Sequence, residues 1–120
     1  MKPSEQLKQA YAILKDEDWL PTPLLPSRIG YRLNSEIWLK REDCSPIGSF
    51  KLRGGLTAMS SNKDVVKKTP VYVASAGNYG LAIAEAGKRF GVSVTVFVSN
   101  NANPSKIRCI LDTGAQVVHH

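Results

Sequence analysis

A short apolar strand, a helix and a second apolar strand follow one another closely in the second half of the sequence. Residues 71–74 and 92–98 are β-branched runs of the kind that form buried strands, and residues 81–90 between them have the length of a helix. Gly91 stands where a left-handed residue ends a helix. Short connections of this kind favour parallel strands joined by right-handed helical crossovers. The pattern predicts an α/β fold, an open parallel sheet with helices on both faces in three layers.

The alternation continues on both sides of this unit. Asn103 followed by Pro104 is typical of the cap and first residue of a helix, whose inward face would hold Ile107, Ile110 and Leu111. The other predicted elements are a helix near residues 4–14, a strand near 37–41, a helix with Leu52, Leu56 and Met59 on one face, and a strand at 115–118.

The composition is that of an ordinary soluble globular protein. Of the 120 residues, 42% are apolar and 22% are charged, and this length suits one domain. The net charge of +6 comes from lysine and arginine pairs scattered among acids, so nucleic-acid binding is not predicted. There is neither a bilayer-spanning apolar run nor a signal-peptide apolar region, so we expect a cytoplasmic protein without a membrane partner. Cys44 and Cys109 lack ligand-like spacing and predict reduced thiols, although two cysteines also allow one bridge.

Lys51 occupies an unusual place for a lysine. It lies at the centre of SPIGSFKLRGG at residues 45–55, where Ser49 is a typical helix cap that would put Lys51 in the first helical turn. The positive end of a helix opposes an ammonium group there and eases formation of the neutral amine, which is the form that attacks carbonyl carbons. A chemical role is one interpretation, and a solvated surface lysine is the other.

The segment SAGNYG at residues 75–80 follows the first of the two strands. Gly77 and Gly80 allow the backbone to approach a ligand closely, and amides at the start of the next helix would point toward an anion. Ser75 adds a hydroxyl group and Asn78 an amide. A plain strand-to-helix turn explains the same residues equally well. The glycine spacing is not that of the dinucleotide-binding fingerprint.

Taken together, four segments closely resemble the pyridoxal-phosphate enzymes of the tryptophan-synthase β fold, which is fold type II. This group includes threonine and serine dehydratases, cysteine synthases, cystathionine β-synthases and threonine synthases. The resemblance runs from about Thr22 to Val118. The four segments are PTPL at residues 21–24, LKRED at 39–43, GSFKLRG at 48–54 and SAGNYG at 75–80.

The resemblance implies a pyridoxal 5′-phosphate cofactor. Lys51 matches the lysine that holds the cofactor as a Schiff base and moves protons at the substrate α-carbon. Asn78 matches the asparagine that hydrogen-bonds the 3-hydroxyl oxygen of the cofactor. The loop that receives the substrate α-carboxylate would be formed by Ser75, Ala76, Gly77, Asn78 and Tyr79. No metal site is implied, because two adjacent histidines, His119 and His120, are weak evidence for one.

The motifs point to two branches of the group. SFKLRG at residues 49–54 looks most like the threonine and serine dehydratases, whereas PIG at 46–48 and SAGNYGLAIA at 75–84 look more like cysteine or threonine synthases. A lyase that releases ammonia by β-elimination from a serine- or threonine-like amino acid is favoured. The alternative is a β- or γ-replacing synthase. The resemblance also implies a small amino-acid substrate and a homo-oligomer in the full-length form.

In this family the cofactor phosphate rests on a glycine-rich loop that has no counterpart in residues 1–120. We therefore expect an N-terminal portion of the fold, in which residues 1–50 contribute to an incomplete larger domain and residues 51–120 form a small α/β domain. This portion alone is expected to bind the cofactor poorly and to release little or no ammonia from serine or threonine. A non-catalytic remnant and an anion-binding α/β module are the alternatives without catalysis.

Overall fold

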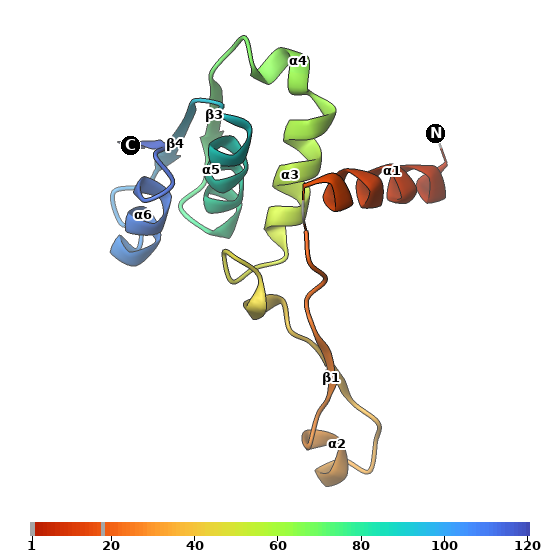
Figure 1. Cartoon of the computed structure of the whole chain (residues 1–120). Helices are drawn as coiled ribbons and strands as arrows, with labels where there is room; N and C mark the ends of the chain where they lie inside the picture. The colour runs from red at the N-terminus through yellow and green to blue at the C-terminus, as the bar shows by residue number, and fades with distance from the viewer. Residues whose placement is uncertain (1, 18) are drawn as a thin grey trace.

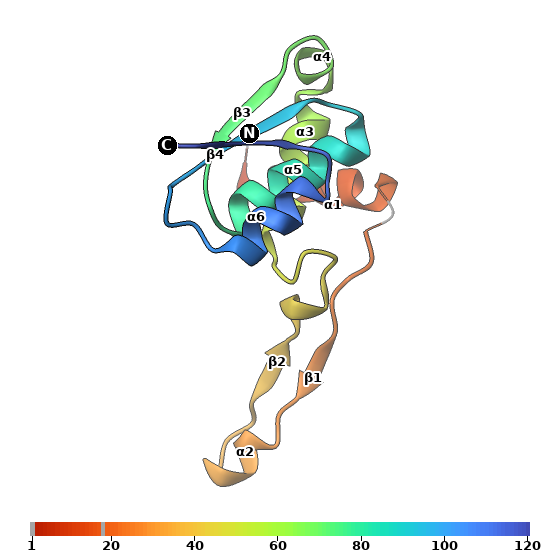
Figure 2. The same ribbon diagram turned by 90° about the vertical axis from the view of Figure 1, so that its left-hand side faces the viewer.

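The computed structural model describes residues 2–17 and 19–120 and contains an α/β unit, an N-terminal helix and a projecting two-stranded arm (Figures 1 and 2). The helices are α1 (Pro3–Asp16), α2 (Ile29–Arg32), the 3-10 helix η1 (Glu42–Cys44), α3 (Lys51–Ser61), α4 (Lys63–Val66), α5 (Asn78–Phe90) and α6 (Pro104–Leu111). The strands are β1 (Leu24–Pro26), β2 (Trp38–Lys40), β3 (Val71–Ala74), β4 (Val94–Val98) and β5 (Gln116–His119).

The predicted parallel sheet is confirmed. Strands β3, β4 and β5 pair in parallel in the order β3-β4-β5, with Val73 opposite Val96 and Val96 opposite Val117. Successive side chains of a strand point to opposite faces, and β4 buries every second residue, Val94, Val96 and Val98. One face of the sheet therefore forms the core of the unit.

Helices α5 and α6 cover that buried face of the sheet (Figure 2). Both crossovers progress in the same direction along the order β3-β4-β5, so right-handed connections place both helices on one side. On the opposite face Tyr72 and Phe97 form a tilted aromatic pair with ring centroids 6.3 Å apart, and Tyr72 is 65% exposed. The α/β class with an open parallel sheet is as predicted, but α5 and α6 lie on one face of the sheet, whereas helices were expected on both faces.

Small residues let α5 lie close to the sheet and to α3. Ala82 and Ala86 are fully buried, and a Cβ atom on Gly87 would overlap the side chain of Val94. Gly91 ends α5 in the left-handed conformation, with φ +64°, as predicted. Leu52, Leu56 and Met59 of α3 are buried, which confirms the predicted inward face of that helix.

The N-terminus of α6 is capped as predicted, because the Ser105 N–H donates to Asn103 Oδ1 at 2.9 Å. Ile110 is fully buried, but the prediction that Leu111 faces inward is wrong, since Leu111 is 51% exposed. One residue is a rotation of about 100° around a helix, which turns Leu111 away from the face that Ile110 buries.

The arm of β1 and β2 was not predicted from the proline-rich run at residues 21–26. β1 pairs antiparallel with β2, with Leu25 opposite Leu39, and α2 connects the two strands at the tip of the arm (Figure 1). The side chain of Lys40 donates to the carbonyl oxygen of Thr22 and ties the base of the arm together. Pro26 is tolerated because it lies at the end of an edge strand.

Among residues 2–17 and 19–120, no helix has both the length and the apolar character needed to cross a bilayer. In the same part of the chain, no three His, Cys, Asp or Glu side chains converge as metal ligands would. Cys44 and Cys109 are both free thiols on the surface.

Candidate functional site

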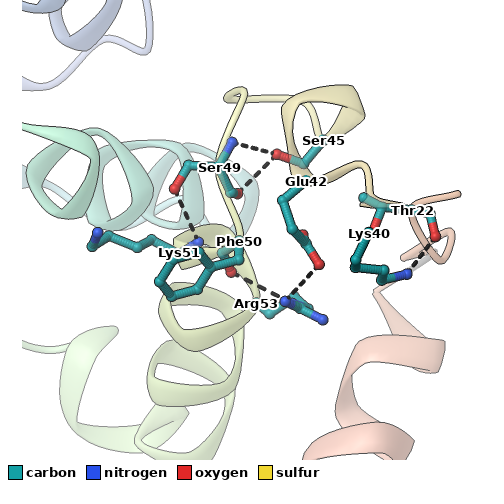
Figure 3. A network of polar contacts seen from close by, with 8 residues as sticks. All are labelled: Thr22, Lys40, Glu42, Ser45, Ser49, Phe50, Lys51 and Arg53. Carbon is teal, nitrogen blue, oxygen red and sulfur yellow. Dashed lines mark hydrogen bonds and ion pairs between the residues drawn. The ribbon is translucent and has the colours of Figure 1, made fainter. Parts of the chain in front are cut away.

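Lys51 is the first residue of α3, in agreement with the predicted first helical turn (Figure 3). The predicted cap at Ser49 lies one residue too early, because Phe50 adopts helical angles and takes the cap position. Ser49 still serves the helix start, since its Oγ accepts from the Lys51 N–H at 3.3 Å. The Lys51 Nζ lies 4.9 Å from the ring centroid of Phe50, which is a cation–π contact that holds the amine near the helix start.

A buried pair of hydrogen bonds shapes the backbone just before Lys51. Ser45 Oγ donates to the Ser49 carbonyl oxygen at 2.8 Å and accepts from the Ser49 N–H at 2.7 Å (Figure 3). Gly48 between them has φ +64°, a conformation that side chains rarely adopt. A single hydroxyl group therefore closes the loop that presents Lys51.

Replacing Ser45 by alanine is expected to lower the free energy of unfolding by about 1–3 kcal/mol, because both Ser49 backbone groups lose a buried partner. Urea unfolding followed by circular dichroism measures this loss. Ser61→Ala is the matched control, because Ser61 is exposed at the end of α3. A Ser45→Ala chain as stable as the Ser61→Ala chain would contradict this role for the hydroxyl group.

Ion pairs join the loop to α3 and η1. Arg53 Nη2 lies 2.9 Å from Glu42 Oε1 and links the first turns of α3 to η1 (Figure 3). Arg41 pairs with Asp43 at 2.7 Å on the surface, and this hydrogen bond lowers the pKa of the Asp43 carboxyl. Exposed pairs of this kind contribute little to stability, so the partly buried Arg53–Glu42 pair is the one that matters for the position of Lys51.

The predicted loop at residues 75–80 is shorter in the structure, because α5 begins at Asn78 and not at residue 81. Asn78 and Tyr79 are therefore residues of the first helical turn, and Ser75, Ala76 and Gly77 form the connection. The Gly77 N–H donates to Ser75 Oγ at 3.3 Å. A Cβ atom at position 80 would overlap the Ser75 carbonyl oxygen and lie 3.0 Å from a Val96 methyl carbon, so the first turn of α5 packs closely against this connection and β4.

The start of α5 has free hydrogen-bonding capacity directed away from the helix. The first N–H groups of an α-helix have no partner within the helix and carry a partial positive charge. In α5 these groups belong to the residues around Asn78 and Tyr79, directly after β3. Such a helix start binds carboxylate or phosphate.

Lys106 also lies at this site, although it was not predicted from the sequence. Its Nζ donates to Asn78 Oδ1 at 2.6 Å, and both residues are partly buried. Lys106 is the third residue of α6, which begins at Pro104 after the cap at Asn103. Lys106 could have been predicted from the same feature as Lys51, because both are lysines in the first turn of a helix, where the helix dipole opposes an ammonium group.

Lys51 and Asn78 begin two helices that lie side by side. A Cβ atom on Gly55 would lie 2.8 Å from the Ala82 carbonyl oxygen, so α3 and α5 approach closely at these residues. Lys51 lies four residues before Gly55 in α3, and Asn78 lies four residues before Ala82 in α5. Four residues correspond to about 6 Å along each helix. The starts of α3, α5 and α6 lie at the same end of the unit (Figures 1 and 2). The amine and the amide are therefore at about the same level.

A cavity of about 340 Å³ opens at the carboxyl ends of the three parallel strands. Ligands of open α/β sheets bind at this edge. Of the predicted site residues, Ser75 and Ala76 line the cavity, whereas Lys51 and Asn78 stand at the starts of the neighbouring helices. The complete lining is Ala74, Ser75, Ala76, Phe97, Val98, Ser99 and His120.

The family model described as pyridoxal-phosphate dependent enzyme matches residues 16–120. The chain belongs to this family. The predicted resemblance is thereby confirmed, and so is pyridoxal phosphate as the cofactor of the family.

Among curated relatives, the biosynthetic L-threonine dehydratase of Haemophilus influenzae is 35% identical over 100 residues, which are 82% of this chain and 20% of that protein. The L-threonine ammonia-lyase of Thermotoga maritima is 32% identical over 114 residues, which are 95% of this chain and 28% of that protein. The chain thus spans less than a third of the length of these two relatives.

Two solved structures of the family share the fold of this chain. A pyridoxal 5′-phosphate-dependent aspartate racemase superposes with a TM-score of 0.86 at 31% identity, covering 97% of this chain and 37% of the racemase. Threonine deaminase isoform 2 from Solanum lycopersicum superposes with a TM-score of 0.79 at 28% identity, covering all of this chain and 36% of the deaminase. The arm and the α/β unit therefore belong to the fold of this pyridoxal-phosphate family.

Proposed function

We propose that this chain carries the cofactor-attachment lysine and the substrate-carboxylate loop of an enzyme that removes ammonia from a serine- or threonine-like amino acid. The observation that carries this proposal is that Lys51 and Asn78 begin neighbouring helices at about the same height along the two helix axes. This follows from the close approach of Gly55 and Ala82. Family membership and relatives named as threonine dehydratase and ammonia-lyase support it.

The residues at this edge fit the aldehyde and the ring oxygen of pyridoxal phosphate and the carboxylate of an amino-acid substrate. Lys51 supplies a primary amine, Asn78 an amide, and the start of α5 a set of backbone N–H groups. The amine would hold the aldehyde carbon, and the Asn78 amide would bind the ring oxygen. When bound, the cofactor supplies an electron-withdrawing ring that lets the substrate α-carbon lose its proton.

Lys51 would also act as the acid and base at the substrate, because an amine close to the α-carbon can accept the α-proton and return it. The Lys51 Nζ lies 4.9 Å from the ring centroid of Phe50. The substrate loses water across its α- and β-carbons. Water then replaces the nitrogen, which releases ammonia and leaves a 2-oxo acid.

The substrate carboxylate is assigned to the connection between β3 and α5. The Ser75 hydroxyl oxygen already accepts from the Gly77 N–H, so its own hydrogen is free to be donated to a carboxylate oxygen. Backbone N–H groups of Ala76 and Tyr79 would add to this, together with the positive end of the α5 dipole.

The remaining features of the proposal concern the whole protein. Residues 1–50 would contribute to a larger domain and residues 51–120 would form the small domain, an arrangement that the projecting arm supports (Figure 1). We further propose a cytoplasmic homo-oligomer that acts on a small amino acid, as expected for metabolic enzymes of this family.

Racemisation is a second candidate, favoured by the similarity to the aspartate racemase. Both reactions need a base at the α-carbon, and they differ in whether the β-substituent leaves. Incubation with L-serine, L-threonine or L-aspartate distinguishes them, because elimination yields a 2-oxo acid and ammonia whereas racemisation yields only the D-enantiomer.

Covalent capture tests the attachment site without requiring tight binding. The chain is mixed with pyridoxal phosphate, reduced with borohydride and digested, and the modified lysines are located by mass spectrometry. We expect Lys51 to be modified well before Lys88, which is an exposed lysine near the end of α5. Equal modification of Lys51 and Lys88 would remove the support for Lys51 as the attachment residue.

A further inference from the structure

Lys106 and Asn78 form a side-chain contact between two helix starts. Asn78 is the first residue of α5, Lys106 is the third residue of α6, and the Nζ–Oδ1 distance is 2.6 Å. Neither side chain is fully exposed. The Asn103 side chain caps α6 and so fixes the backbone that carries Lys106.

The electrostatics of this contact are unusual. The starts of α5 and α6 both carry partial positive charge, and each opposes an ammonium group placed beside it. A lysine that made no specific contact would be expected to extend into water, whereas the Lys106 amine donates to the Asn78 oxygen. The contact also brings a full positive charge to the edge of the sheet where an anion is expected.

The chemistry of the two groups decides how the Asn78 amide is oriented. An ammonium group has three donors and no acceptor, so it binds the oxygen of the amide and never its nitrogen. The Lys106 amine therefore holds the Oδ1 side of the Asn78 amide. The NH₂ group, on the other side of the amide carbon, is left as the donor for a ligand.

We propose that Lys106 is a positioning residue that holds Asn78 so that its NH₂ group donates to the ring oxygen of pyridoxal phosphate. This inference rests on the proposed function. A donor at that oxygen favours its deprotonated, anionic form, and the nearby Lys106 charge acts in the same direction. The pull of the ammonium group on Oδ1 also makes the amide a stronger donor, because linked hydrogen bonds polarise one another.

The first test needs no cofactor. The carboxamide carbon of Asn78 is followed by NMR in the unaltered chain and in Lys106→Met, Lys106→Arg and Lys88→Met. We expect an upfield shift in Lys106→Met, because the amide oxygen loses its donor, and a smaller shift in Lys106→Arg. Lys88→Met removes an exposed lysine from the far end of α5 and should leave the signal unchanged. An unchanged signal in Lys106→Met overturns the inference.

The second test uses 4-deoxypyridoxine 5′-phosphate, which has the ring oxygen and the phosphate but no aldehyde, so that Lys51 cannot form a covalent bond. We expect Lys106→Met to weaken its binding about three- to tenfold, as for the loss of one hydrogen bond. The pH at which the bound ring oxygen loses its proton, followed by ultraviolet absorption, should rise. Lys106→Arg should restore both quantities toward those of the unaltered chain, which a merely structural role would not predict for the pH midpoint.

The outcomes separate this inference from the proposed function. Modification of Lys51 by pyridoxal phosphate together with an unchanged pH midpoint in Lys106→Met would overturn the role of Lys106 alone. Failure of the analogue to perturb the Asn78 amide signals would also overturn it. Failure to modify Lys51 in the capture experiment would instead contradict the proposed function, whatever the Asn78 carbon signal shows.

Discussion

Replacing Lys51 by alanine is expected to abolish the visible absorption that pyridoxal phosphate acquires on joining the chain, and to weaken its binding by about 100-fold or more. Lys51 is the amine that we propose bonds covalently to the aldehyde carbon, whereas the Lys106 amine binds the Asn78 oxygen. Without Lys51, only the Asn78 amide remains as a proposed contact to the cofactor ring. Absorption titration with pyridoxal phosphate measures both effects.

Removal of Lys51 also removes the proposed base at the α-carbon. In the full-length protein, ammonia release from L-serine or L-threonine should therefore fall by about 10²–10⁴-fold, the usual contribution of a positioned acid–base group. Lys88→Ala is the matched control and should keep both the absorption and the affinity. An absorption band that persists in Lys51→Ala but disappears in Lys88→Ala would assign the attachment to Lys88 and contradict the role of Lys51.

Replacing Gly55 and Gly54 by alanine is expected to have opposite effects on stability. A Cβ atom on Gly55 would lie 2.8 Å from the Ala82 carbonyl oxygen, so Gly55→Ala forces α3 and α5 apart and should cost about 1–3 kcal/mol. A Cβ atom on Gly54 meets nothing within 4 Å. Gly54→Ala should stabilise α3 by about 0.5–1 kcal/mol, because alanine loses less backbone freedom on folding than glycine.

The two neighbouring variants are controls for each other, since the substitution and the helix are the same. Urea unfolding gives the free energies, and borohydride capture of pyridoxal phosphate gives the state of the site. Gly55→Ala should also reduce capture at Lys51, because the contact with Ala82 sets the level of Lys51 against Asn78. If Gly54→Ala is destabilised as much as Gly55→Ala, the close approach of α3 and α5 does not explain why alanine is unfavourable at position 55.

Sequence reasoning predicted the elements whose signals are local. The capping pair Asn103 and Pro104, the left-handed Gly91 and the strand β4 each depend on a few neighbouring residues, and the structure contains all three. Lys51 at the start of α3 was predicted for the same reason. The family followed from motifs that are contiguous in the chain, and the match over residues 16–120 confirms it.

Local signals failed where contacts between distant segments decided the outcome. The pairing of β1 with β2 depends on hydrogen bonds across the arm, and a proline-rich run carries no sign of them. α5 begins at Asn78, before its predicted start at residue 81, and Gly80 in its first turn packs between the Ser75 carbonyl group and Val96, a residue of another strand. Leu111 is exposed because the packing of α6 selects Ile110 as its buried residue.

By itself, the sequence determined the order of α3, β3, α5, β4, α6 and β5, the parallel sheet and the lysine at a helix start, because backbone preferences and apolar periodicity act over a few residues. Only the tertiary structure decided that Gly55 meets Ala82, which brings Lys51 level with Asn78, and that Lys106 binds the Asn78 oxygen. These contacts join residues more than 25 positions apart, and their geometry depends on how closely whole helices pack.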